Sequence, residues 1–107
     1  MTFYLKQHDT LPALEASLIN PDGTAVDLTG AAVKFVMTAA DGTPVVDAAG
    51  AIVAPATDGK VRYDWLAEDT AVPGAYRAEF EVTFVGSRYT FPNNDYLAVQ
   101  ITKSLGQ

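Results

Sequence analysis

The sequence predicts an all-β fold, an antiparallel β-sandwich of seven to eight strands with no disulfide. Three observations predict it. Apolar and polar residues alternate along several short segments, turn signals rich in Asp and Gly separate these segments, and the chain has no cysteine. Alternation with a period of two is typical of half-buried strands, and short strands spaced by such turns are typical of sandwiches and barrels. With 107 residues the chain fits one domain, which we expect to cover residues 1–107.

Five segments carry the clearest alternation, namely residues 14–18, 33–37, 61–65, 76–84 and 97–101. An N-terminal run over residues 2–7 and weaker runs near Val45 and Ile52 complete the predicted strands. The turn signals between the strands lie at residues 20–24, 40–43, 47–50, 57–60 and 85–88. In the last of these, Gly86 at the first turn position predicts a two-residue hairpin of type II′. The one helical candidate, residues 66–71, is a single turn at most because Pro73 follows it.

The stretch from Asp69 to Tyr76 indicates which kind of sandwich this is. Pro73 and Gly74 come just before Tyr76, which begins the longest alternating segment. In a tyrosine corner, such a tyrosine packs on the edge of the core while its hydroxyl bonds to backbone a few residues upstream. We therefore predict a structural corner from Asp69, Gly74 and Tyr76, and an immunoglobulin-like sandwich in which large buried side chains replace the missing disulfide.

The composition excludes several classes of function. Seven basic residues against 13 acidic ones give a formal net charge of −6, which repels phosphate backbones and anionic membrane surfaces. We therefore expect neither nucleic acid nor a membrane as partner. The lack of cysteine excludes thiolate chemistry and zinc–cysteine sites. No stretch of about 18 apolar residues is present, and the N-terminus lacks the apolar region of a secretory signal.

The sequence does not predict a catalytic group of side chains. His8 is the only imidazole, and its neighbour Asp9 would point to the opposite face of an extended strand. Any nucleophilic serine, Ser17, Ser87 or Ser104, would need His8 as its base, and none lies in a Gly-x-Ser-x-Gly motif. We expect His8 to be a polar residue at a strand end, and the protein not to be an enzyme.

Two sets of carboxylates are candidate sites. Glu79 and Glu81 lie on one strand face, about 7 Å apart by the rise of a strand, and we expect them on a solvated face beside a basic residue. Asp22, Asp41 and Asp58 each precede a glycine, a pattern that hairpin turns explain without a metal. We expect no cofactor and no metal, and the alternative left open is a calcium ion held between loops.

The aromatic residues divide into two groups. Tyr63 and Trp65 share the phase of Val61, so we expect them to fill the core, and the alternative is an exposed platform for sugars. The second group breaks the alternation near the N-terminus or flanks the bend at residues 90–95, where aromatic side chains make good interface anchors. Its members, which form the predicted protein–protein interface, are Phe3, Tyr4, Tyr89 and Tyr96. The alternative is that a second sheet layer buries all four.

Four phrases resemble the N-terminal immunoglobulin-like domain of phage baseplate upper proteins. They are KQHDTLP (residues 6–12), VDLTG (26–30), GKVRYDW (59–65) followed by DT and GAY (69–70 and 74–76), and FPN (91–93). Each phrase is weak by itself, but their order and spacing across nearly the whole chain are specific.

The resemblance implies a non-catalytic structural role in a virion, with the domain docking onto other phage structural proteins in a symmetric, multi-copy assembly. Relatives carry this domain at the front of a longer chain, whereas this chain stops at Gln107. A free-standing version could instead decorate a capsid, seal the neck or join modules of the tail. The alternative function is a carbohydrate-binding module for host glycans, and a small hydrolase built on His8 is a third hypothesis.

Overall fold

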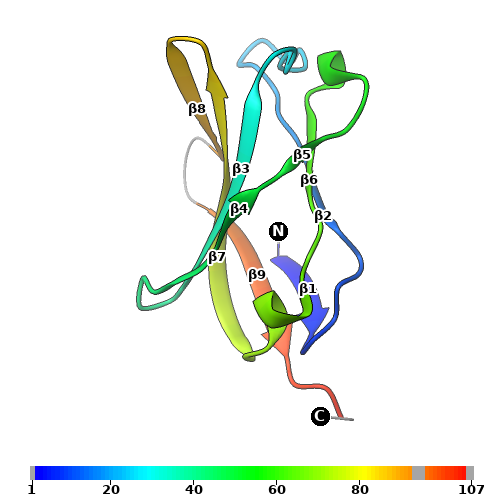
Figure 1. Ribbon diagram of the computed structural model, residues 1–107, viewed down its shortest axis with the longest axis vertical. Coiled ribbons are helices and arrows are strands. Elements are labelled where there is room, and N and C mark those ends of the chain that lie inside the picture. Colours follow the sequence, from blue (N-terminus) through cyan, green and yellow to red (C-terminus); the bar gives the residue numbers. More distant parts are fainter. Residues whose placement is uncertain (1, 93–95, 106–107) are drawn as a thin grey trace.

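The computed structural model describes residues 2–92 and 96–105, and it confirms the all-β sandwich (Figure 1). Two single-turn 3₁₀ helices, η1 (Ala56–Asp58) and η2 (Ala67–Thr70), interrupt the strands. None of the helical segments in the described part of the chain has the length and apolar character needed to cross a membrane. The strands are β1 (Thr2–Lys6), β2 (Leu14–Ser17), β3 (Ala32–Ala39), β4 (Pro44–Ala49), β5 (Ala51–Ile52), β6 (Lys60–Tyr63), β7 (Gly74–Phe84), β8 (Ser87–Phe91) and β9 (Leu97–Thr102).

The strands form a larger and a smaller sheet. The larger sheet has the order β1-β9-β7-β3-β4, with β8 also paired to β7, and the smaller sheet has the order β2-β6-β5. Every pair among these strands is antiparallel except β1–β9, which is parallel. The nine strands are one more than the upper bound of the prediction, because Ser87–Phe91 forms a strand of its own.

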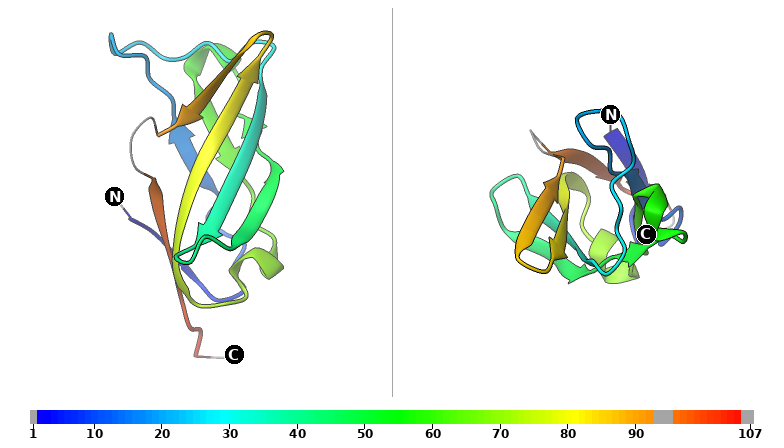
Figure 2. Two further views of the ribbon diagram at one scale, coloured as in Figure 1. Left: turned by 90° about the vertical axis from the view of Figure 1, so that its left-hand side faces the viewer. Right: turned by 90° about the horizontal axis from the view of Figure 1, so that it is seen from above.

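Strand β7 is the centre of the larger sheet. One edge of β7 pairs with β3 along most of its length, from Tyr76, which lies opposite Ala39, to Thr83, which lies opposite Ala32. The other edge is shared, because β9 pairs with its first half and β8 pairs with its second half. The larger sheet therefore has a β9 half and a β8 half, which lie one after the other along β7 (Figure 2).

The chain crosses between the two sheets at Gly50. Residues 47–50 were expected to form a turn, and this prediction was wrong: Asp47 lies within β4, and the chain runs on through Gly50 into β5 of the smaller sheet. The Gly50 N–H donates to the Val33 carbonyl at 3.0 Å, and a Cβ at Gly50 would lie 3.0 Å from Val33 Cγ1. A larger residue would crowd this crossing, so the glycine is explained by close packing rather than by a turn.

Two local predictions can be compared with the structure directly. The two-residue hairpin between β7 and β8 is confirmed, but Gly86 occupies its second position with φ of 81°, so the type II′ assignment was wrong. The single helical turn expected over residues 66–71 is confirmed as η2, which ends before Pro73.

The core is built around an aromatic cluster that joins the sheets. Phe35 on β3 stacks on Tyr63 of β6, with ring centroids 4.4 Å apart and an interplanar angle of 13°. Trp65 meets Phe35 edge-on at 5.6 Å, and Phe80 packs against Phe35 at 5.1 Å. The prediction that Tyr63 and Trp65 fill the core is confirmed, since they are only 4% and 3% exposed. Such aromatic contacts hold the sheets together where an antibody domain would use a disulfide.

We predict that Phe35→Ala lowers the free energy of unfolding by about 3–5 kcal/mol, because it empties the centre of the aromatic cluster. Denaturant unfolding followed by tryptophan fluorescence measures this loss. Val85→Ala is the matched control, since Val85 is fully exposed at the hairpin tip and its truncation should leave stability unchanged. Equal stability of the Phe35 variant and the wild type would contradict the role given to the cluster.

Candidate interaction surface

The connection between β6 and β7 is held by a buried carboxylate. Asp69, on η2, accepts a hydrogen bond from the Tyr63 hydroxyl at 2.5 Å and another from the Leu66 N–H at 2.9 Å. Burial, together with the bond to Asp69, raises the pKa of the Tyr63 hydroxyl well above its ordinary value. Tyr63 therefore stays protonated and remains a donor. Asp69 was predicted as a corner residue, but its partner Tyr63 was not predicted; the only signal for the pair in the sequence is an acid six residues after a core tyrosine.

Tyr76 closes the same connection from its far side. Its hydroxyl donates to the Val72 carbonyl at 2.6 Å, four residues upstream, which is the geometry of a tyrosine corner. Gly74 has φ of 155°, and a Cβ there would lie 3.7 Å from the Tyr76 ring. The hydrogen bonds of Asp69 in the described residues go to Tyr63 and Leu66, so this carboxylate and Tyr76 act at opposite ends of the connection.

The loop after β1 is tied to η2. The His8 N–H donates to the Thr70 carbonyl at 3.0 Å, and the Thr70 hydroxyl donates to the Asp9 carbonyl at the same distance. The Gln7 side-chain amide donates to the Ala71 carbonyl at 2.7 Å. His8 has φ of 69° and an exposed side chain, so the structure places it in a turn after a strand. No hydrogen bond joins its side chain to a serine within residues 2–92 and 96–105.

The predicted interface residues do not lie together. Tyr4 is 66% exposed and Tyr96 is 51% exposed, and both belong to the outer face of the larger sheet in its β9 half. Phe3 and Tyr89 are partly buried and pack against the core, with the Phe3 ring 6.2 Å from that of Trp65. The structure thus brings Tyr4 and Tyr96 to one surface and separates them from Phe3 and Tyr89. Asn93, the last residue of the resemblance phrase FPN, lies outside the described residues.

A shallow hollow of about 130 Å³ lies beside Tyr96 on this outer face. Val36, Thr38, Glu79 and Arg77 line it together with Tyr96. The Arg77 guanidinium carbon is 5.4 Å from the centre of the Tyr96 ring, and its Nη2 donates to the Ala40 carbonyl at 2.9 Å. An exposed aromatic ring held by an arginine is a good contact for another protein, because both side chains are already partly ordered.

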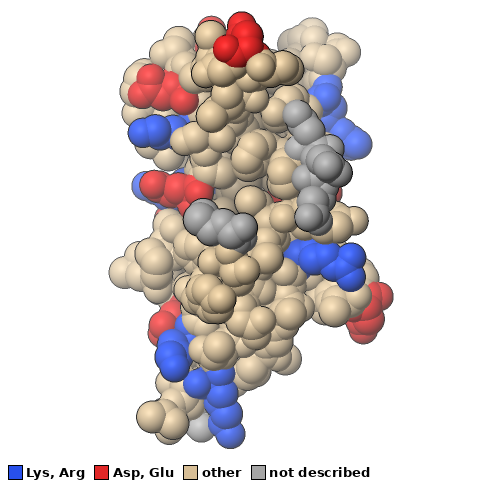
Figure 3. Space-filling view, turned by 180° about the vertical axis from the view of Figure 1, so that it is seen from behind, with Lys and Arg blue, Asp and Glu red and all other residues tan. Residues whose placement is uncertain are grey.

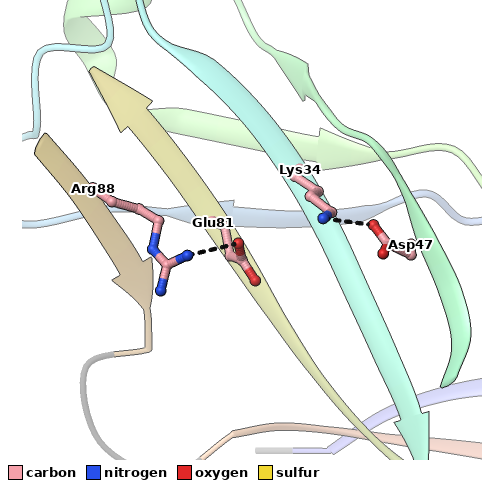
Figure 4. Close-up of polar contacts among 4 residues, drawn as sticks. All are labelled: Lys34, Asp47, Glu81 and Arg88. Atoms are coloured by element: carbon pink, nitrogen blue, oxygen red, sulfur yellow. Dashed lines mark ion pairs between the residues drawn. The ribbon is translucent and has the colours of Figure 1, made fainter. Parts of the chain in front are cut away.

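The β8 half of the same face carries ion pairs instead. Lys34 lies 2.9 Å from Asp47, and Arg88 lies 3.7 Å from Glu81 (Figure 4). The prediction that Glu81 lies on a solvated face beside a basic residue is confirmed by its pair with Arg88. The hydrogen bond and charge of Asp47 raise the pKa of the Lys34 ammonium. Exposed ion pairs of this kind contribute little to the free energy of folding. Their main effect is therefore on the charge of the surface in the β8 half.

The side of the molecule opposite to Figure 1 is less charged at its middle. Seen from behind, most lysine, arginine, aspartate and glutamate side chains lie toward the margins of the outline (Figure 3). Strands β1 and β9 belong to this side in the ribbon view (Figure 1). The charged side chains of the described residues are therefore unevenly distributed over the surface. The β9 half of the larger sheet borders the side that carries fewer of them at its middle.

Three exposed turns share the pattern Asp-x-Thr. In each turn the carboxylate accepts a hydrogen bond from the N–H of the threonine two residues later, at 3.0, 3.0 and 2.9 Å. These bonds, and those of the threonine hydroxyls first of all, lower the pKa values of the three carboxyls. Within the described residues no group of three or more His, Asp or Glu side chains is placed to hold a metal ion. The aspartate–threonine pairs of the three turns are Asp22–Thr24, Asp27–Thr29 and Asp41–Thr43.

Comparison with models of protein families gives a match over almost the whole chain. The model of the family described as "BppU N-terminal domain" matches residues 3–103. No curated protein matches the chain. The match spans β1 to β9, and so both halves of the outer face described above.

We predict that Tyr76→Phe lowers the free energy of unfolding by about 1 kcal/mol, because it removes the bond to the Val72 carbonyl. Thermal and denaturant unfolding measure the change. Tyr4→Phe removes the same hydroxyl from an exposed tyrosine and should have no effect. A Tyr76 variant as stable as the Tyr4 variant would show that the corner contributes nothing.

We predict that the pKa of Asp22 lies below its ordinary value of 3.8 and rises toward it in Thr24→Val, which removes the hydroxyl donor. Because the folded pKa is the lower one, the stabilisation is complete above the unfolded pKa and is lost as the pH falls through the folded pKa. Carboxyl NMR titration measures both values. Thr43→Val, in a separate turn, should leave Asp22 unchanged, and an unshifted Asp22 in the wild type would refute the assignment.

Proposed function

Because residues 3–103 match its model, the chain belongs to the family of baseplate upper protein N-terminal domains, and we propose that it acts as a non-catalytic adaptor in the phage virion. The family is one of phage baseplate structural proteins, and the proposal is that this immunoglobulin-like domain docks onto neighbouring subunits. The site of docking is a tail or baseplate, or else the neck or capsid, where the domain is present in several symmetric copies. The single observation that carries the proposal is the family match over almost the whole chain.

The docking surface proposed is the β9 half of the outer face. It offers two exposed tyrosines, Tyr4 and Tyr96, in a domain whose other described aromatic side chains are buried or partly buried. Tyr96 is backed by Arg77 and borders the hollow lined by Val36 and Thr38. Large aromatic side chains that are held in place lose little conformational freedom on binding, so they contribute more to affinity than mobile ones.

The arrangement of the other candidate groups also favours a structural role. His8 lies in the turn after β1, whereas Ser17 lies in β2 of the smaller sheet and Ser87 begins β8. Trp65, the aromatic residue best suited to stack on a sugar, is buried in the core. This burial weighs against a carbohydrate-binding module, which needs exposed rings, and leaves Tyr4 and Tyr96 for contact with protein.

We predict that the chain is present in purified virions of the phage that encodes it. Mass spectrometry of density-purified particles detects it, and cryo-electron microscopy gives the local symmetry of its position. Sixfold or threefold symmetry at the tail tip would assign it to the baseplate, and quasi-sixfold symmetry on the shell would assign it to the capsid. Particles that lack the chain would refute the virion role.

We predict that Tyr4→Ala and Tyr96→Ala lower incorporation of the chain into virions while leaving its melting temperature nearly unchanged. Phe3→Ala and Tyr89→Ala should act in the opposite manner, because their rings pack against the core and their loss reduces stability. Quantitative mass spectrometry of particles and thermal unfolding of the isolated domain measure the two effects. Val85→Ala, at an exposed hairpin tip, is the control for incorporation. Normal incorporation of both tyrosine variants would move the docking surface elsewhere.

A further inference from the structure

Four charged side chains of alternating sign form a row across the outer face of the larger sheet. In spatial order they are Arg88 on β8, Glu81 on β7, Lys34 on β3 and Asp47 on β4 (Figure 4). Glu81 lies directly opposite Lys34 in the β3–β7 ladder, so the two lateral pairs are joined at the centre. We call these four residues the charge row. Its order of signs across the strands is plus, minus, plus, minus.

The charge row is open to solvent and only partly used within the chain. The side chains of Arg88, Lys34 and Asp47 are 66%, 48% and 60% exposed, and that of Glu81 is 22% exposed. Each makes one ion pair inside the chain, at 3.7 or 2.9 Å. An ammonium has three donors, a guanidinium five, and a carboxylate about four acceptor positions, so one ion pair uses only part of the capacity of each side chain.

The central pair of the charge row, Lys34 and Glu81, is complementary to itself under one particular symmetry. A two-fold axis parallel to the strands, passing between β3 and β7 in the plane of contact, reverses the order of strands in the facing copy. Lys34 then meets Glu81 of the second copy, and Glu81 meets Lys34 of that copy. Arg88, level with Thr83, and Asp47, level with Glu79, lie on opposite sides of this central pair along the strands. A two-fold axis perpendicular to the strands through this pair would instead place Lys34 opposite Lys34 and Glu81 opposite Glu81 of the second copy, which is unfavourable. Charge complementarity therefore selects both the partner and the orientation.

The rest of this half of the face is compatible with such a contact. Around the charge row the outward positions are small or polar, such as Ala32, Thr83 and Thr90. Glu79, the next outward residue of β7, would face Val36 of the second copy, two residues from Lys34 of that copy along β3. Two twisted sheets packed face to face keep their strands within about 30° of each other, which the selected axis allows.

We infer that the β8 half of the outer face is a self-association surface, on which a second copy of this chain docks through the charge row. Tyr4 and Tyr96 in the β9 half remain for a different partner, and the two surfaces meet at Val36 and Glu79. The contact is polar and small, so it is a weak dimer whose register is set by charge, strengthened where copies are already held side by side. It extends the multi-copy role proposed above, but it is a property of the isolated chain. Virions without the chain would refute that role and leave the dimer unaffected.

Charge reversal tests the inference. Sedimentation velocity of the wild-type chain at low ionic strength, up to about 1 mM, should show a monomer–dimer equilibrium. Lys34→Glu places like charges opposite each other twice in the dimer, and so does Glu81→Lys, so each single variant should associate at least about tenfold more weakly. An equimolar mixture of the two variants should associate again, because the new glutamate then faces the new lysine and the native Glu81 faces the native Lys34. The double variant should dimerise as well.

The mixture separates a contact between copies from one within the chain. Mixing leaves the repulsion inside each variant unchanged, so only an intermolecular contact is rescued. Lys60→Glu and Glu15→Lys reverse exposed charges on the smaller sheet and should dimerise like the wild type. Circular dichroism melting shows that each variant is folded. A wild type that is monomeric throughout, single variants that dimerise normally, or a mixture that stays monomeric would each overturn the inference.

Discussion

The stacking of Phe35 on Tyr63 is the contact on which the remaining structure depends. It joins the two sheets at the centre of the core, where Trp65 and Phe80 close around the same ring. Tyr63 also extends this contact outward, because its hydroxyl donates to the buried carboxylate of Asp69. A single side chain thus links the packing of the sheets to the position of η2. Removing water from this cluster strengthens both the apolar contact and the hydrogen bond.

From η2 the constraint spreads to both edges of the connection. Thr70, fully buried, binds the loop after β1 through its hydroxyl and its carbonyl. On the other side, the Tyr76 hydroxyl binds the Val72 carbonyl just before β7 begins. Strand β1 and strand β7 are therefore set by the same short segment. Because β9 pairs with both of them, the β9 half of the outer face is positioned by the core itself.

The outer face of the larger sheet has two halves of different chemistry because β8 and β9 share one edge of β7. The β9 half presents two exposed tyrosines, Tyr4 and Tyr96, and a shallow hollow beside Tyr96, which suits contact with another protein. The β8 half presents ion pairs of alternating sign. The proposed role in a multi-subunit particle calls for more than one contact surface, and this division would supply two without any change in the backbone.

The sequence by itself determined the all-β class, most strand positions and the core placement of Tyr63 and Trp65, because an alternation of period two is a local signal. It also indicated Tyr76 as a corner residue, since the motif lies within a few positions. Tertiary structure alone decided the parallel pairing of β1 with β9, the crossing at Gly50, and the partner of Asp69. It also decided that Tyr4 and Tyr96 face outward while Phe3 and Tyr89 pack inward. These outcomes depend on which distant strands become neighbours, and alternation within one strand carries no information about its partners.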